Sequence, residues 1–360
     1  MPHPIRRAPE APPLPDGRDV GAHHGSRGRF RNPWPPHPDA ERRPGGFLSW
    51  MWDRFGADLP PNPATDEIPR GTPDPARPRA DPREIRLTLV GHATFLLQVG
   101  GLNLLTDPIW TRRAGPYSAL GGPRLTGPGM ALEALPPLDG VILSHGHYDH
   151  LDARTVRMIV HRFGGSLPWY TPLGYAAWLR RRGVREVVEL DWWQETRRDG
   201  PAGPLRLVCL PARHWTRRAL AANRALWASW AVLEPGPGAP DAPRAPRGVY
   251  FGGDSAYGPS FREIGERLGP FRAVILPIGA YAPRWFMAPS HMDPEEAVRA
   301  YRDLGGRGAF VGMHWGTFRL SDEHPLEPPL RTKAAWAAAG LPEADLHLPG
   351  PGGTVRIEDG

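Results

Sequence analysis

The pattern of hydrophobic and polar positions changes at residue 84, where a proline-rich stretch ends. Residues 85–90 then alternate between apolar and polar side chains, which predicts a strand, and further strands are expected at 94–99 and 102–105. The Gly100-Gly101 pair between the last two strands predicts a hairpin turn. The main domain therefore begins with strands.

Short apolar runs later in the chain are typical of strands that are buried on both faces. We expect such strands at residues 141–144, 168–171, 187–190, 205–210, 228–233, 249–251, 273–278 and 309–312. The intervening segments predict helices at residues 153–163, 173–182, 261–268, 294–304 and 326–338. Strands followed by alternating helices and strands are typical of a layered, sheet-rich α/β domain.

Three regions can be separated by composition. Residues 1–30 contain proline, arginine, glycine and histidine with almost nothing apolar, so we expect a disordered leader. Residues 31–83 form a proline-rich extension with room for one short helix between Pro44 and Pro60. Their aromatic cluster consists of Trp34, Phe47, Trp50, Trp52 and Phe55. These side chains either pack on the main domain, residues 84–360, or touch a membrane interface, where Trp is favoured.

Composition and charge exclude several classes of protein. Proline and glycine make up a quarter of the 360 residues, but no Gly-X-Y period is present, which excludes collagen. The net charge of +6 is spread along the chain without a Lys/Arg tract, so no nucleic-acid partner is expected. Cys209 is the only cysteine, which excludes intramolecular disulfides and cysteine-based zinc sites. Without a membrane-spanning apolar run or a signal h-region, we expect a cytoplasmic protein.

The segment from Ser144 to His150 carries three imidazoles and a carboxylate directly after a predicted buried strand. Its residues His145, His147, Asp149 and His150 are of the types that bind zinc and related ions. Side-chain alternation puts His145 and His147 on one side of an extended loop. Packing does not require so many titratable groups at the end of a strand, and the pattern predicts a metal site.

Three further candidates each follow an apolar strand: His214, Asp254 and His314. Alone, each is more often a packed histidine or a capping aspartate than a metal ligand. Together they indicate that several strand ends meet at one edge of the sheet, where loops assemble active sites. Asp107 also follows a strand and either orients a ligand histidine or forms an Asp-Pro turn.

The motif His145-x-His147-x-Asp149-His150, followed in order by His214, Asp254 and His314, resembles the metallo-β-lactamase-fold hydrolase superfamily. The chain is most similar to the branch that contains N-acylphosphatidylethanolamine-hydrolysing phospholipase D and its bacterial relatives. Supporting segments are residues 29–35, 91–94, 105–110, 135–139, 211–215, 252–257, 281–287, 291–297 and 314–318.

The resemblance implies a four-layer αββα sandwich with two Zn²⁺ ions at one edge of the sheets. Matched by residue, His145, His147 and His214 would hold the first ion, and Asp254 would bridge both ions. The second ion would be held by Asp149, His150 and His314. A hydroxide held between the two metals would then act as the nucleophile.

The resemblance also implies a catalytic role for Asp149, which would orient the nucleophile or pass a proton to the leaving oxygen. His291, His92 and Tyr148 are expected to contact the substrate or shape its pocket, and His92 matches a family position beside the metals that is not a ligand. The segment 285–287 either forms an apolar wall for acyl chains or belongs to the core.

The expected activity is a zinc-dependent phosphodiesterase of phospholipase D type that acts on N-acylphosphatidylethanolamine-like lipids. The partners are then a phospholipid or small phosphodiester, with peripheral contact to the inner membrane face, and a homodimer is left open. One alternative is a lactonase or another hydrolase of the same fold, since the Gly91-His92-Ala93-Thr94 segment also resembles sugar-phosphate lactonases. A non-catalytic metal-binding regulatory protein is a remote alternative.

Overall fold

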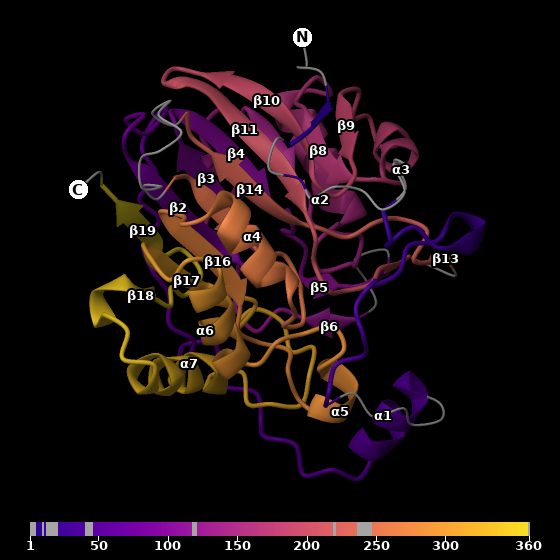
Figure 1. The fold of residues 1–360 in the computed structure, drawn as a ribbon. Coiled ribbons are helices and arrows are strands. Elements are labelled where there is room, and N and C mark those ends of the chain that lie inside the picture. The colour runs from indigo at the N-terminus through magenta and orange to yellow at the C-terminus, as the bar shows by residue number, and fades with distance from the viewer. Residues whose placement is uncertain are drawn as a thin grey trace.

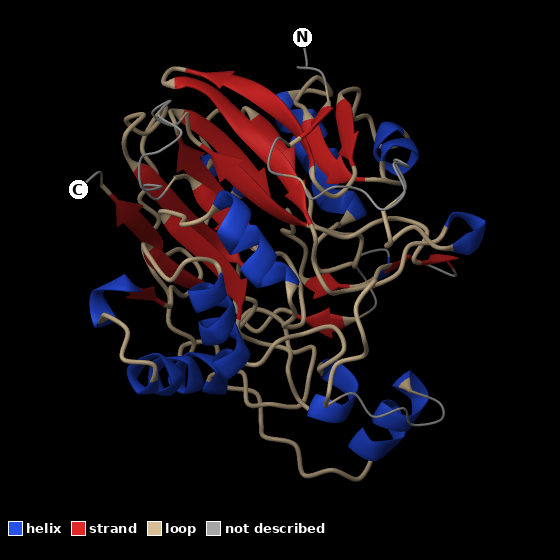
Figure 2. Cartoon of the chain, in the orientation of Figure 1, coloured by secondary structure: helices blue, strands red, loops and turns tan. Residues whose placement is uncertain are grey.

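The computed structural model describes residues 5–8, 11, 21–39, 46–116, 121–218, 221–235 and 247–358. Two large sheets face each other, and helices cover the outer face of each sheet (Figure 1, Figure 2). One hydrophobic core lies between the sheets, and a second core lies under the helices of the first sheet. The expected α/β class and αββα sandwich are therefore confirmed.

The first sheet has seven strands in the order β19-β2-β3-β4-β7-β8-β9. They are β2 (Ile85–Gly91), β3 (Thr94–Val99), β4 (Leu102–Thr106), β7 (Gly140–Ile142), β8 (Trp169–Pro172), β9 (Val187–Leu190) and β19 (Thr354–Ile357). Alternation decides the packing of β3, because Phe95 and Leu97 join the core between the sheets while Leu96 joins the outer core. The expected hairpin joins β3 to β4 through Gly100 and Gly101, whose φ values are 57° and 75°.

The second sheet has eight strands in the order β1-β10-β11-β14-β15-β16-β17-β18. They are β1 (Arg6–Arg7), β10 (Gln194–Gly200), β11 (Gly203–Leu210), β14 (Ser229–Leu233), β15 (Val249–Phe251), β16 (Ala273–Pro277), β17 (Ala309–Met313) and β18 (Leu346–His347). Two small antiparallel pairs are β5 (Arg113–Ala114) with β6 (Gly122–Pro123), and β12 (Arg217–Arg218) with β13 (Ala221–Ala222).

Helices α2 (Ala153–Phe163) and α3 (Ala176–Arg180) cover the first sheet, and their buried side chains form the outer core. Helices α4 (Ser260–Leu268), α6 (Pro294–Asp303) and α7 (Glu327–Ala338) cover the second sheet (Figure 1). The short helices α1 (Phe47–Arg54) and α5 (Arg284–Met287) lie next to each other, away from the sheets (Figure 1). Short 3-10 helices span Ser26–Gly28, Leu132–Ala134 and Glu343–Asp345.

Helix α6 begins as its sequence predicts. The carboxylate of Asp293 accepts a hydrogen bond from the N–H of Glu296, the side chain of Glu296 accepts one from the N–H of Asp293, and Pro294 lies in the first turn. This capping box satisfies N–H groups that a helix start leaves free. None of the described helices is long and apolar enough to cross a membrane.

The described N-terminal residues lie on the second sheet. Strand β1 pairs with β10, and the ring of His23 stacks on that of Trp192 with centroids 4.1 Å apart. Residues 5–8 and 21–30 of the predicted leader therefore contact residues that are distant in the sequence, and the disorder of the leader stays a prediction. The rest of the leader, apart from residue 11, lies outside the described residues.

Strand directions bring the functional loops together. Strands β4, β7 and β8 are parallel in the first sheet, and β15, β16 and β17 are parallel in the second. Because the carboxyl ends of parallel strands meet at one edge of a sheet, the loops after these strands converge at one end of the sandwich. Two successive antiparallel pairings give β11 the same direction as β15.

Candidate metal centre

The loops that follow β2, β7, β11, β15 and β17 meet at this edge and carry all seven predicted metal ligands. The loop after β7 contributes His145, His147, Asp149 and His150, and the loops after β11, β15 and β17 contribute His214, Asp254 and His314. The loop after β2 adds His92, which is not among the seven. Potential ligand atoms of these residues form two groups, each with its atoms within 4.8 Å of one another. The structure therefore brings together every residue of the predicted ligand set.

The first group consists of His145, His147, His214 and Asp254. Nδ1 of His147 lies 2.9 Å from Nε2 of His145 and 3.1 Å from Nε2 of His214. Oδ2 of Asp254 lies 3.8 Å from Nε2 of both His145 and His214. Three imidazole nitrogens and one carboxylate oxygen thus point at a common centre.

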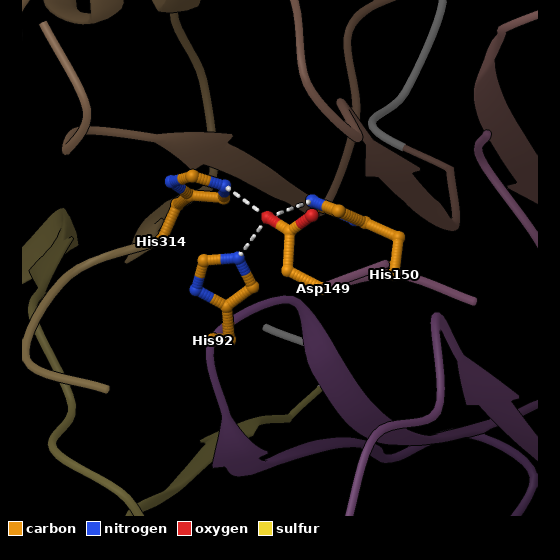
Figure 3. Close-up of side chains that lie close together, drawn as sticks. All are labelled: His92, Asp149, His150 and His314. Carbon is orange, nitrogen blue, oxygen red and sulfur yellow. Dashed lines mark hydrogen bonds and ion pairs between the residues drawn. The ribbon is translucent and has the colours of Figure 1, made fainter. Parts of the chain in front are cut away.

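The second group consists of His92, Asp149, His150 and His314 (Figure 3). Oδ2 of Asp149 lies 3.3 Å from Nε2 of His150 and 3.6 Å from Nε2 of His314. Asp254 also reaches this group, because its two oxygens each lie 3.2 Å from an Nε2 atom, Oδ2 from His150 and Oδ1 from His314. Asp254 therefore contacts both groups, as the bridging role implied by the resemblance requires.

His92 occupies the position expected for a residue beside the metals. Its Nε2–H donates a hydrogen bond of 2.8 Å to Oδ2 of Asp149 (Figure 3). Its ring lies 3.9 Å from that of His314. His92 and His314 both have positive φ, at 59° and 67°, which is uncommon for residues other than glycine. Such backbone strain concentrates at functional sites.

The charges of the site are unevenly distributed. Burial, together with the surrounding imidazoles, holds the pKa of His145 well below its usual range, and burial does the same for the pKa of His214. Burial raises the pKa of Asp254, but the charges of His150 and His314 outweigh it and hold that pKa well below the usual range. Asp254 and Asp149 in turn overcome burial and raise the pKa of His314 to about 9.

These residues fit a divalent metal. The carboxylates of Asp149 and Asp254 are compensated by protons on buried imidazoles, and a metal cation supplies the same positive charge without those protons. Nε2 of His150, Nε2 of His314 and Oδ1 of Asp254 are buried and make ion-pair contacts but no aligned hydrogen bond among the described residues. Buried polar atoms are normally satisfied, and these belong to good metal-ligand types.

Neighbouring groups fix the orientation of the histidines. Nδ1–H of His150 donates to Asp107, and Nδ1–H of His214 donates to the carbonyl oxygen of Ser290 at 2.9 Å. Each bond leaves Nε2 facing the centre. Of the two interpretations of Asp107 left open by the sequence, the structure supports orientation of a ligand histidine.

Arg218 and Asn32 also support the site, and the sequence did not single out either side chain. Nη1 of Arg218 donates to the carbonyl oxygens of Gly146 and Leu151, at 2.8 Å and 2.7 Å, and so spans the ligand loop. The amide of Asn32 donates to the carbonyl oxygen of His214 at 2.9 Å. The Asn-Pro-Trp segment was noted only as part of the resemblance, and an isolated arginine among many carries no sequence signal.

A cavity of about 750 Å³ opens over both groups. His147, Asp149 and Asp254 lie at its floor, while Trp50, Phe286 and Met287 contribute an apolar wall. Met287 is also buried, so the segment 285–287 supplies both wall and packing. A mostly apolar cavity with a few convergent polar groups is typical of a small-molecule site.

Of the three residues predicted to contact the substrate, Tyr148 and His291 line this cavity and His92 does not. Tyr148 lies under the guanidinium of Arg218, at 4.5 Å from the ring centroid. The ring of His291 lies 5.1 Å from that of His214, and burial lowers the pKa of His291 to about 4. Their contact with substrate remains a prediction.

Residues 102–315 match the model of the family described as the beta-lactamase superfamily domain. The chain belongs to this superfamily. It is one of the metal-dependent hydrolases of the fold, and the metallo-β-lactamase resemblance seen in the sequence is confirmed.

Relatives of this superfamily member include an uncharacterised protein of Mycobacterium tuberculosis, 40% identical over 315 residues, which cover 85% of this chain and 79% of that one. The N-acyl-phosphatidylethanolamine-hydrolyzing phospholipase D 1 of Caenorhabditis elegans is 39% identical over 249 residues, 67% of each chain. This similarity supports the branch indicated by the motifs. A metallo hydrolase from Ignicoccus hospitalis matches the fold with a TM-score of 0.56 at 23% identity, covering 77% of this chain and 100% of its own.

Proposed function

We propose that this protein is a metal-dependent phosphodiesterase of phospholipase D type. Its substrates would be N-acylphosphatidylethanolamine-like lipids, which are split into phosphatidic acid and an N-acylethanolamine. One observation carries the proposal: two groups of histidine and aspartate side chains lie at the floor of a cavity whose wall is largely apolar. The polar floor suits a phosphodiester, and the apolar wall suits acyl chains. The 39% identity to a relative named for this activity supports the same substrate class.

We also propose that the site holds two zinc ions, which its histidine and aspartate residues fit. His145, His147 and His214 would hold one ion, Asp149, His150 and His314 the other, and Asp254 both. When bound, such ions act as Lewis acids toward water and phosphoryl oxygens.

Asp149 is the proposed catalytic carboxylate. It lines the cavity, and the hydrogen bond from His92 fixes the orientation of its Oδ2. An oriented carboxylate beside the reacting phosphate can hold the attacking water and then pass a proton to the leaving oxygen. His291 also lines the cavity, and we assign it hydrogen bonding to the phosphate of the substrate.

A lipid substrate requires access from a membrane, and α1 supports this part of the proposal. Trp50 of this helix lines the cavity and stacks on Phe286 with ring centroids 5.0 Å apart. Leu48, Trp52 and Phe55, on or next to the same helix, are exposed. Exposed aromatic and aliphatic side chains of this kind insert into membrane interfaces. We therefore propose peripheral contact with the inner face of the membrane and a cytoplasmic location. The homodimer stays a prediction.

The decisive experiment combines metal analysis with a panel of substrates. Purified protein loaded with Zn²⁺ is offered N-acylphosphatidylethanolamine, a soluble phosphodiester and a lactone, and products are identified by mass spectrometry. We expect phosphatidic acid from the lipid and two metals per chain. Asp254→Asn and His147→Ala should lose most of the activity and bind less metal, because each removes a group facing the centre. Hydrolysis of the lactone alone would favour the lactonase alternative, and no turnover of any substrate would favour a regulatory role.

A further inference from the structure

A second cavity, of about 520 Å³, shares no lining residue with the one over the metal centre. It lies where α4 and α6 meet the segment around His37. Three arginines line it, namely Arg213, Arg262 and Arg299, together with Tyr257 and three carboxylates. The size falls within the range of roughly 300–1,000 Å³ that is typical of small-molecule sites.

Arg213 is the unusual member of this cavity. The residue is only 6% exposed, yet none of the ion pairs between described residues involves its guanidinium. Its described side-chain hydrogen bond runs from Nη1 to the carbonyl oxygen of Tyr257 and is long, at 3.4 Å. A buried cation without a directly paired carboxylate is costly, and an anion bound beside Arg213 would lower that cost.

The carboxylates of the cavity already have partners among the described residues. Glu296 is bound by Nε2 of His37 at 3.0 Å and by Nη2 of Arg284 at 2.9 Å. Asp39 also lies 3.2 Å from Nη2 of Arg284.

The third carboxylate, Asp303, accepts a hydrogen bond of 2.5 Å from the hydroxyl of Tyr257. The guanidinium of Arg299 lies over the ring of Tyr257, 4.5 Å from its centroid. Tyr257 therefore contacts both Arg213 and Arg299, and neither guanidinium pairs with a carboxylate within the described residues.

We propose that this cavity, with Arg213 and Arg299 as the binding groups, is a second ligand site that takes the phosphate group of a small phosphate monoester. Guanidinium groups match phosphate oxygens with paired, charge-assisted hydrogen bonds. A doubly charged phosphate uses two arginines where a carboxylate needs one. The remaining volume accommodates the organic part of the ligand.

Occupancy of this site reaches the metal centre through the backbone. Arg213 directly precedes the predicted ligand His214, and its N–H donates to Oγ of Ser255, the residue after Asp254, at 2.9 Å. The N–H of Ala256 donates back to the carbonyl oxygen of Arg213 at 2.8 Å. A ligand that orders Arg213 therefore also steadies the segments that carry His214 and Asp254, and it should tighten metal binding whatever the substrate of the enzyme.

Equilibrium dialysis of the metal-loaded protein against radiolabelled glycerol 3-phosphate tests the site. Wild type should bind one ligand per chain more than Arg213→Gln, whether or not the metal centre also binds the probe. Arg299→Gln should weaken this site by about tenfold, the loss of one charge-assisted contact. Arg302→Gln, an exposed arginine on the same helix that does not line the cavity, is the matched control and should bind as wild type does.

Equal stoichiometry for wild type and a folded Arg213→Gln variant would overturn the proposal. If Arg213→Gln does not fold, the exposed residue Arg299 provides the test. An unchanged affinity of Arg299→Gln for glycerol 3-phosphate would equally overturn the proposal. Inorganic phosphate and vesicles containing phosphatidic acid serve as further probes. Loss of vesicle binding in Arg299→Gln without loss of glycerol 3-phosphate binding would overturn the free monoester in favour of a lipid headgroup.

Discussion

Oδ2 of Asp107 lies 2.7 Å from Nδ1 of His150, and both side chains are fully buried. The same carboxylate accepts hydrogen bonds from the N–H and the hydroxyl of Ser144, the last residue before the ligand loop. Asp107 therefore fixes both the tautomer of His150 and the starting point of the loop. A carboxylate that accepts a hydrogen bond from one ring nitrogen of a ligand histidine also raises the basicity of the other ring nitrogen, which binds the metal.

Asp107→Asn should lower metal affinity by about 10- to 100-fold, because a neutral amide replaces the carboxylate that orients His150. The measurement is a metal titration against a competing chelator. Asp139→Asn is the matched control: Asp139 is also buried and pairs with Arg79, but it belongs to neither metal group. It should lower thermal stability and leave metal affinity unchanged. Equal metal affinity in the Asp107→Asn variant and wild type would contradict the orienting role.

The sequence predicted a layered α/β domain and a metal site because both leave local signals, whereas the four-layer sandwich and the assignment of ligands to two ions came from the family resemblance. Buried strands are apolar runs, and the metal-ligand types recur directly after them, as at His145 and His214. Strand β10 was missed because its residues are polar and only pairing with β11 makes it a strand. No local pattern marks contacts between residues far apart in the chain.

The same limit explains the residues around the site that escaped prediction. Arg218 contacts a loop about 70 positions away in the sequence, as its bonds to Gly146 and Leu151 show. His23 and His24 belong to the stretch predicted as a leader, yet both contact Asp191 in the folded chain. The metal-ligand residues can be recognised in the sequence by their chemistry, whereas the residues that hold them in place can be recognised only from their positions in the folded structure.

Arg218→Gln should destabilise the protein by about 1–3 kcal/mol, because two buried carbonyl oxygens lose their donor. It should also reduce metal-dependent turnover, since the loop from Gly146 to Leu151 carries His147, Asp149 and His150. Arg218→Lys should rescue little, because an ammonium lacks the planar fork that lies over Tyr148. Thermal unfolding and steady-state kinetics measure both effects. Arg154→Gln, at an exposed arginine, serves as control. An Arg218→Gln variant with the same stability and rate as this control would refute the proposed role of Arg218 in holding the ligand loop.

The contact of Asp191 with His23 and His24 predicts a pH dependence of stability. Burial raises the pKa of Asp191, but the hydrogen bonds from His23 at 2.6 Å and His24 at 2.7 Å outweigh it and lower the pKa overall. A lowered carboxyl pKa stabilises the fold above the unfolded-state pKa, and this contribution is lost as the pH falls through the folded-state value.

Asp191→Asn should therefore reduce the melting temperature at pH 6, and the difference from wild type should shrink as the pH falls below about 4. Thermal unfolding monitored by circular dichroism across this range provides the measurement. A difference that stays constant or grows toward acid pH would show that the charge of Asp191 does not stabilise the N-terminal contact.

The exposed side chains of α1 lead to the last prediction, which concerns membranes. Trp52 of this helix and Phe55, which directly follows the helix, are 81% and 92% exposed, while Trp50 of the same helix lines the cavity. The double variant Trp52→Ala/Phe55→Ala should bind phospholipid vesicles at least about tenfold more weakly, because two large apolar side chains no longer enter the interface. Turnover of a soluble phosphodiester should not change, since neither residue lines the cavity.

Leu330→Ala is the matched control for this experiment. Leu330 is 66% exposed on α7, which is distant in the fold from α1 (Figure 1). Vesicle sedimentation should therefore give the same binding for this variant and wild type. If the α1 double variant loses no more vesicle binding than Leu330→Ala, exposed apolar area in general accounts for the association. If it instead loses turnover of the soluble phosphodiester, Trp52 and Phe55 act on the cavity and not at a membrane, and the membrane-contact proposal fails.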